Sequence, residues 1–262
     1  MAGLGRAKIG LPSQFASAFS FHRKFAFCLS SSTSSNGVVF YGNGPYVLNH
    51  NVLSESLVYT PLLLYHYSTG PAYMEGQASS DYFINVKSIK INDETVPLNT
   101  SLLVIKEYGY GGTKISTVNP YTVLENTIYT AFVDLFLKEV PAHIPRVAPV
   151  EPFGACFNST RIGRTRVGPA VPTVDFVLQS GSVYWRFLGA NSMVQVNEEV
   201  LCLGFVDAGL SPSNPMTSIV IGGLQLEENF LQFDLAASRL GFCNSLLSGP
   251  TTCADFNFTS IA

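Results

Sequence analysis

The chain has 262 residues, of which 47% are apolar and 13% are charged, and its formal net charge is −3. This slightly acidic balance gives no electrostatic reason to expect nucleic acid or an anionic membrane as a partner. No stretch approaches the roughly 20 consecutive apolar residues that a membrane-spanning helix needs. Composition therefore favours an apolar globular protein, long enough to bury a substantial core.

The predicted elements are mostly short strands, because alternating runs recur between clusters of Gly, Pro, Asn and Ser. In chain order they begin with a helix over 11–19, where Pro12 suits the first turn, and a strand over 37–42. An exposed linker over 68–80 and a strand over 82–87 follow, and then a helix over 120–140 with apolar residues at helical spacing from Leu124 to Leu135. Further strands are expected over 174–178, 182–185, 193–196 and 200–205. The pattern predicts an all-β barrel or sandwich with few helices.

One glycine-rich loop, residues 111–118, reads Gly-Gly-Thr-Lys-Ile-Ser-Thr-Val. It resembles the loop Gly-Gly-x-x-x-Asp-Ser/Thr-Gly of the pepsin-like aspartic proteases. Ser116 stands where that loop has its catalytic aspartate, Thr117 matches the hydroxyl residue, and Val118 replaces the final glycine. The resemblance implies that the pepsin-like fold is kept at this loop while its catalytic group is absent.

The chemistry of these proteases requires two carboxylates that share one proton. The hydroxyl of Ser116 cannot replace a carboxylate, since its pKa lies far outside the useful range. None of the aspartates in the chain begins an Asp-Ser/Thr-Gly triplet. We therefore predict a non-catalytic protein with a degenerate site at Ser116, Thr117 and Val118. The alternative, an aspartic endopeptidase with residual activity, requires both carboxylates to come from elsewhere.

Other segments narrow the resemblance to one branch of this fold. Residues 11–16, 191–194, 221–227 and the tail 251–259 resemble the plant xylanase-inhibitor and extracellular dermal glycoprotein family, which includes basic 7S globulins. The resemblance implies an all-β pepsin-like fold with few short helices. Residues 1–75 would be the end of an N-terminal lobe and residues 76–262 a complete C-terminal lobe, so that the chain is an N-terminally truncated member.

The cysteines and the sequons indicate an extracellular protein. The sequons at Asn99, Asn158 and Asn257 are candidate glycosylation sites. The family pattern implies disulfides Cys156–Cys202 and Cys28–Cys243, and it leaves the partner of Cys253 in the missing half. Five reduced, buried cysteines are the alternative. The first residues have no apolar signal region, so secretion to the cell wall is expected from the resemblance alone.

The resemblance also implies a function: inhibition of microbial cell-wall glycoside hydrolases, xylanases or xyloglucan endoglucanases, in plant defence. Such enzymes carry a pair of carboxylates in an open cleft, and the planar fork of arginine matches carboxylate geometry. The candidate contacts are Arg161, Arg164 and above all Arg166, with the loop Ser211–Pro215 as a second contact. A solvated basic loop beside a glycan at Asn158 is the alternative for these arginines.

The remaining patterns point to no further chemistry. The four histidines share no metal-ligand spacing, and the glycines at 109–112 lack the Lys-Ser ending of a phosphate-binding loop. We expect no metal, no cofactor and a monomer whose partner is another protein. A storage or peptide-binding glycoprotein of the 7S-globulin type is a further alternative function.

Overall fold

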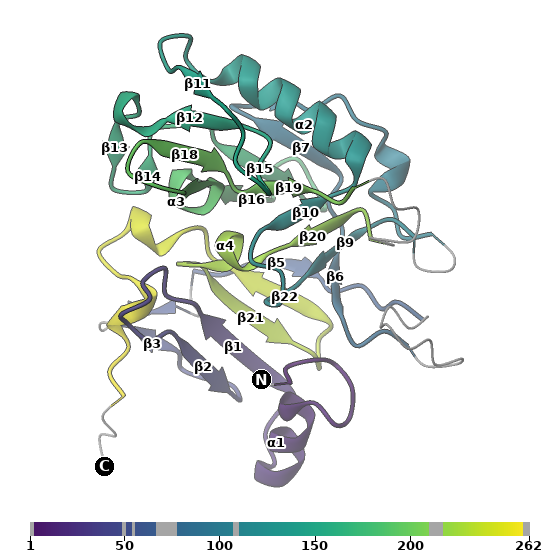
Figure 1. Ribbon diagram of the computed structural model, residues 1–262. Helices are drawn as coiled ribbons and strands as arrows, with labels where there is room; N and C mark the ends of the chain where they lie inside the picture. The colour runs from purple at the N-terminus through teal and green to yellow at the C-terminus, as the bar shows by residue number, and fades with distance from the viewer. Residues whose placement is uncertain are drawn as a thin grey trace.

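The computed structural model describes residues 3–48, 51–53, 56–66, 78–106, 110–209 and 217–258. Within these ranges the chain is built almost entirely of short strands, with a few helices on the outside (Figure 1). No helix in the described part of the chain is long and apolar enough to cross a bilayer.

The strands of the first half are β1 (Lys24–Cys28), β2 (Val38–Tyr41), β3 (Val47–Leu48), β4 (Asn51–Val52), β5 (Val58–Pro61), β6 (Tyr82–Ile84), β7 (Ser88–Ile91), β8 (Glu94–Thr95), β9 (Thr113–Ile115) and β10 (Thr122–Leu124). Those of the second half are β11 (Arg146–Val147), β12 (Cys156–Asn158), β13 (Arg164–Thr165), β14 (Gly168–Pro169), β15 (Val174–Val177), β16 (Tyr184–Phe187), β17 (Met193–Gln195), β18 (Val200–Leu203), β19 (Phe205–Asp207), β20 (Ile219–Ile221), β21 (Phe230–Asp234) and β22 (Arg239–Phe242).

The helices are α1 (Leu11–Phe19), α2 (Asn126–Glu139), α3 (Gly189–Ser192) and α4 (Gly223–Leu226), with 3-10 turns η2 (Thr100–Leu102), η4 (Ser159–Arg161), η5 (Leu246–Ser248) and η6 (Cys253–Asp255). The helix predicted over 11–19 is confirmed as α1. The helix predicted over 120–140 begins later, because residues 122–124 form strand β10 and the side chain of Glu125 caps α2 by accepting from Thr127 N and Ile128 N.

One sheet joins the two ends of the chain, with the strand order β2-β1-β21-β22-β5. In its centre β1 runs antiparallel to β21, with Phe25 opposite Phe233 and Cys28 opposite Phe230. This sheet forms the lower part of the molecule in Figure 1, with α1 beneath it. The proposed division near residue 75 stays a prediction, but strands from both sides of it share this sheet.

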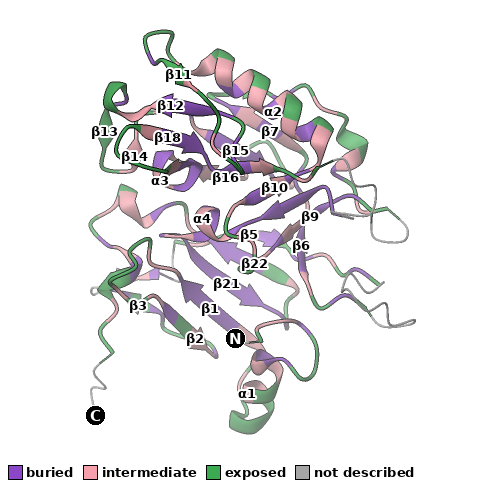
Figure 2. Ribbon diagram, in the orientation of Figure 1, coloured by how far each residue is buried: buried purple, intermediate pink, exposed green. Residues whose placement is uncertain are grey.

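The other large sheets form the upper part of Figure 1, where α2 covers them from outside. Their strand orders are β19-β10-β20-β9-β6, β16-β15-β7-β8 and β11-β12-β18-β17. Buried residues line the strands, while the outer face of α2 is exposed (Figure 2).

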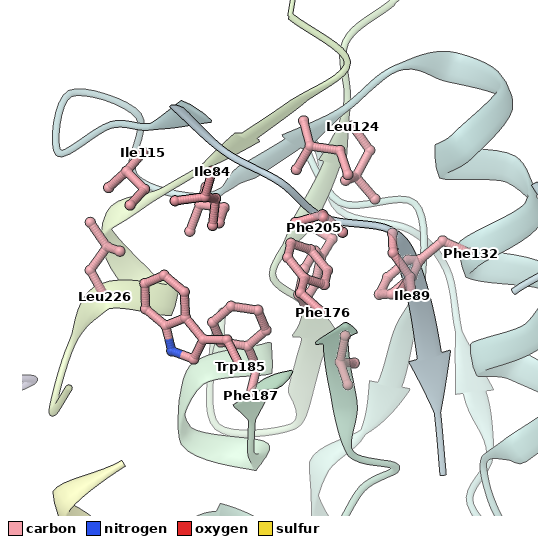
Figure 3. Packing of buried hydrophobic residues seen from close by; sticks show 14 of the residues in the cluster. Ile84, Ile89, Ile115, Leu124, Phe132, Phe176, Trp185, Phe187, Phe205 and Leu226 are labelled. Atoms are coloured by element: carbon pink, nitrogen blue, oxygen red, sulfur yellow. The ribbon is translucent and has the colours of Figure 1, made fainter. Parts of the chain in front are cut away.

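The core between these sheets is aromatic. Trp185 packs near Phe187, Phe176 and Phe205 (Figure 3), and none of these four side chains is accessible to solvent. The rings of Phe176 and Phe187 meet edge to face, with centroids 5.1 Å apart, a geometry that aromatic pairs prefer. The indole N–H of Trp185 donates to Asn229 Oδ1 at 3.2 Å, so the buried donor has a partner.

The disulfides agree with the expectation in one case and correct it in the other. Cys156 and Cys202 face each other on β12 and β18 and are bonded. The predicted bridge Cys28–Cys243 is wrong, because Cys28 is bonded to Cys253 and Cys243 is a free thiol. The pairing of strands gives the reason. Cys28 lies opposite Phe230 on one side, and Cys243 N donates to Phe230 O on the other. Two strand spacings of about 4.8 Å each exceed the separation that a disulfide allows.

Candidate functional site

The degenerate loop Ser116–Val118 follows β9, at the end where β9 runs parallel to β20. Ser116 N donates to Ile221 O at 2.9 Å, which holds the loop against the end of β20. Before β9, Gly111 and Gly112 have φ of 85° and 75°, a region that favours glycine. A Cβ at Gly111 would lie 2.2 Å from Val104 O. The glycine pair is therefore required by the backbone of this turn.

The hydroxyl of Ser116 closes the loop on itself. Ser116 Oγ donates to Asn119 Oδ1 at 2.9 Å and accepts from Val118 N at 3.2 Å and Asn119 N at 3.4 Å. This is a local serine turn. Its bonding capacity is used within the loop, so the side chain holds a turn rather than presenting a nucleophile or an acid.

Val118 stands where the resembling protease loop has its final glycine. It is 77% exposed, and its backbone does not adopt positive φ. The loop turns without a glycine at this position because Val118 points outward.

A cavity of about 230 Å³ lies beside this loop. Its walls include Ser116, Tyr82, Phe27 and Phe233, together with Asp81. Asp81 Oδ2 forms an ion pair with Lys114 Nζ at 3.0 Å. Asp81 is the one carboxylate among the described residues lining this cavity, whereas the acid–base pair of an aspartic protease needs two.

A buried polar network, which the sequence did not predict, lies next to the loop, and Gly223 N at its edge donates to Asn119 O of the loop at 2.7 Å. Gln225 on α4 accepts from Thr122 N at 2.9 Å and from Thr122 Oγ1 at 2.8 Å. Its Nε2 donates to Asn191 O at 2.8 Å and Gly204 O at 3.1 Å, and Asn191 Nδ2 donates back to Leu224 O. Segments 191–194 and 221–227, which carried the family resemblance, are thus bound to each other. Each segment places one amide side chain, Asn191 or Gln225, beside apolar residues, and this combination is the only sign of the network in the sequence.

The candidate arginines lie on or beside the hairpin formed by β13 and β14, which we call the arginine hairpin (residues 161–169). It packs tightly on α3: a Cβ at Gly168 would lie 2.2 Å from Ala190 N, and Ala190 N donates to Val167 O at 2.9 Å. Thr165 Oγ1 donates to Gly168 O at 2.7 Å and fixes the turn. The hairpin is therefore a rigid platform.

The arginine side chains of this hairpin are exposed, whereas its Ile162 is buried in the core. Arg161, Arg164 and Arg166 are exposed, and none of them has an acidic partner within ion-pair distance among the described residues. Arg166 Nη2 donates to Gly249 O, so the hairpin touches the segment after η5. The carbonyl of Gly249 thereby orients Arg166.

The remaining predicted sites are placed as follows. Asn99 and Asn257 are exposed and Asn158 is half-buried; Asn158 Oδ1 accepts from Thr160 N and Thr160 Oγ1. The loop Ser211–Pro215 lies outside the described residues. Within the described ranges, no group of His, Cys, Asp and Glu has the arrangement of a metal site.

Comparison with known proteins fits this architecture. The strand pattern, the closed loop at β9 and the sheet that joins both chain ends define a mostly-β pepsin-like fold. The chain belongs to the xylanase inhibitor family: the model for the xylanase inhibitor C-terminal region matches residues 81–244, and the model for the N-terminal region matches residues 1–43.

Individual relatives are similar over the full chain. The protein named "Probable aspartic proteinase GIP2" of Nicotiana benthamiana is 61% identical over 264 residues, which covers 100% of this chain and 59% of the relative. Gamma conglutin 1 of Prunus dulcis is 46% identical, covering 98% of this chain and 55% of the relative. The chain thus spans little more than half the length of these relatives.

Solved structures confirm the fold. The crystal structure of edgp matches with a TM-score of 0.94 at 60% identity, covering 99% of this chain and 63% of that one. The basic 7S globulin from soybean matches with a TM-score of 0.78 at 37% identity, covering 99% of this chain and 61% of that one. The predicted all-β pepsin-like fold and the family resemblance are both confirmed.

Proposed function

We propose that the protein is a non-catalytic, pepsin-like inhibitor of microbial cell-wall glycoside hydrolases, xylanases or xyloglucan endoglucanases, and acts in plant defence. The observation that carries the proposal is the arginine hairpin. It presents exposed Arg164 and Arg166 from a backbone held against α3, with no described acid to neutralise them. Membership of the xylanase inhibitor family supports the same function.

The target chemistry is the carboxylate pair of a glycoside hydrolase cleft. A guanidinium between two carboxylates forms charge-assisted, often bidentate hydrogen bonds. Arg166 is already oriented by Gly249 O, so less side-chain freedom is lost on binding. We assign Arg166 the central contact, with Arg164 and Arg161 at the rim.

The loss of peptidase chemistry is part of the proposal. Ser116 occupies the position of the catalytic aspartate, its hydroxyl is bound to Asn119, and Asp81 is bound to Lys114. A relative at 61% identity is named a probable aspartic proteinase, so residual peptidase activity is the competing function. A storage role is the other, since gamma conglutins and basic 7S globulin are among the relatives; the sequence pI of about 5.8 does not fit a basic globulin.

The proposed location is the cell wall. Disulfides Cys28–Cys253 and Cys156–Cys202 fit an oxidising compartment. N-glycans at exposed Asn99 and Asn257, and at Asn158 beside the arginine hairpin, fit secretion. We propose that the protein acts as a monomer, binds a protein partner and needs neither a metal nor a cofactor.

The test is inhibition of fungal xylanases and xyloglucan-specific endoglucanases by the purified chain. We expect dose-dependent inhibition of at least one enzyme, weakened tenfold or more by Arg166→Ala. Arg146→Ala, which removes an equally exposed charge on β11, is the matched control and should inhibit like the parent. Full activity of every enzyme at micromolar protein, or pepstatin-sensitive cleavage of a peptide at acid pH, would contradict the proposal.

A further inference from the structure

A second cavity, of about 690 Å³, has no role in the proposed inhibition. We call it the Arg6 cavity. It lies between the segment before α1, the start of β1 and the turn from β21 to β22; its walls are Arg6–Ile9, Arg23, Leu64, Ala78–Ser80, Leu235 and Ser238. Its volume is within the range of about 300–1,000 Å³ that small-molecule sites occupy.

Arg6 is the unusual residue of this cavity. The residue is only 9% exposed, yet among the described residues its side chain makes a single, long hydrogen bond, from Nη1 to Leu63 O at 3.4 Å. A guanidinium has five N–H donors, and this contact uses only one of its nitrogens, so the other donors are available to a ligand. Among the described residues no carboxylate lies within ion-pair distance of Arg6.

The side chains around Arg6 add further positive charge and no described counter-charge. Arg23 and Lys8 also line the cavity. Burial lowers the pKa of Arg6, and the like charge of Arg23 lowers it further against the opposing effect of Tyr82. Two acids near these walls in the described part of the chain are bound to other cations: Asp234 to Lys24 and Arg239, and Asp81 to Lys114.

The walls also have an apolar part. Ile9 and Leu64 are 83% and 56% exposed and lie at the same cavity as Leu235. Hydroxyls of Ser80 and Ser238 complete the lining. The combination is a set of cations beside apolar and hydroxyl groups, which suits an anion with an organic body better than a bare inorganic ion.

We propose that the Arg6 cavity binds a small organic oxyanion, a carboxylate or a phosphate ester, with its charged group between Arg6 and Arg23 and its body against Ile9, Leu64 and Leu235. The oxyanion supplies the acceptors that Arg6 lacks, and the planar guanidinium fork suits both groups.

Calorimetric titration at constant ionic strength tests this, with citrate, glucose 6-phosphate, inorganic phosphate and uncharged glucose as probes. We expect saturable one-site binding of citrate or glucose 6-phosphate, at least tenfold tighter than inorganic phosphate, and none of glucose. The better of the two organic probes identifies the group as carboxylate or phosphate. Equal affinity for inorganic phosphate, or no saturable binding of either organic anion, overturns the proposal.

Variants locate the site. Arg23→Gln should weaken binding of the organic anion at least tenfold, whereas Arg146→Gln, an equal loss of charge at an exposed site on β11, should leave it unchanged. Arg6→Met should abolish binding while the Tm without ligand stays at or above that of the parent, because among the described residues the lost side chain makes only one long hydrogen bond. Unchanged affinity in Arg23→Gln, or a lowered Tm in ligand-free Arg6→Met, contradicts the assignment, the latter because it would make Arg6 a structural residue.

Discussion

Gln225 and Thr122 are bound to each other twice: the side-chain oxygen of Gln225 accepts from both the backbone N–H and the hydroxyl of Thr122, at 2.9 and 2.8 Å. Both residues are inaccessible to solvent. Thr122 Oγ1 in turn accepts from Gly222 N at 3.1 Å. The pair therefore fixes β10 against the turn between β20 and α4, directly behind the loop at Ser116.

Replacement of Gln225 by alanine should destabilise the protein strongly. It leaves the N–H and hydroxyl of Thr122 and two carbonyls without partners, and each buried polar group left unpaired costs about 1–3 kcal/mol. We expect the free energy of unfolding in urea to fall by more than about 3 kcal/mol. Gln195→Ala, the same change at an exposed site on β17, should cost less than about 1 kcal/mol. Similar losses for the two variants would contradict the role of the network.

The ion pair of Arg186 with Asp175 gives a second stability prediction. Arg186 Nε and Nη2 lie 2.7 and 2.6 Å from the two carboxylate oxygens of Asp175, and Asp175 is 3% exposed. Arg186→Leu leaves this carboxylate buried and unpaired, at a cost of about 3–5 kcal/mol. The double variant Arg186→Leu/Asp175→Leu should recover much of that loss in the same urea titration. A double variant no more stable than Arg186→Leu would show that packing, not the charge, sets the cost.

The raised pKa of Glu227 predicts that the stability of the protein depends on pH. Burial, and then the neighbouring charge of Glu228, raises the pKa of Glu227 from 4.5 to about 7. The folded state therefore binds the proton more tightly than the unfolded chain. This contribution to stability is fully present below about pH 4.5 and is lost as the pH rises through about 7. At about 1.4 kcal/mol per pKa unit this contribution is at most about 3.5 kcal/mol, and partial exposure reduces it.

The measurement compares the free energy of unfolding of the parent and of Glu227→Gln between pH 4.5 and 8. Their difference should grow in favour of the variant with rising pH. Glu94→Gln, at an exposed acid on β8, serves as control and should track the parent. Parallel curves for the parent and Glu227→Gln would rule out the raised pKa.

Cys243 should be slow to alkylate. Burial raises the pKa of its thiol from 9.0 to about 11, and Phe230 N donates to its sulfur at 3.3 Å. Because the thiolate is the nucleophile, the reaction with iodoacetamide at pH 8 should be about a hundredfold slower in the folded protein than in urea. Mass spectrometry should find the label on Cys243 after unfolding without reduction. Rapid labelling of the native protein, or a label on Cys253, would contradict the arrangement.

The sequence predicted the elements and the fold well, because helix α1 and the strands depend on local alternation and on motifs that the family shares. It could not predict β10: Val123 pairs with Val206 and Val220, partners far along the chain, so a local helical period misassigned residues 122–124. The predicted partner of Cys28 was wrong for the same reason. Only the strand pairing around Phe230 shows that Cys243 lies two strands away from Cys28, which leaves Cys253 as the partner. The candidate site was predictable where residues are consecutive, as in the arginine hairpin. The cavity at Arg6 was not predictable, since the burial of Arg6 depends on segments that are far apart in the chain and meet only in the folded protein.

The pairing of β1 with β21 has a consequence for biosynthesis. Cys28 cannot pair with Phe230 until the ribosome has added roughly two hundred further residues. At about 5–20 residues per second, β1 leaves the ribosome about 10–40 s before its neighbour exists. During that interval the apolar strand Lys24–Cys28 lacks its central partner, and the thiol of Cys28 lacks the cysteine it will join. The central strand pair therefore forms only after most of the chain has been synthesised, and the native disulfide requires that Cys28 stays reduced until Cys253 has been added.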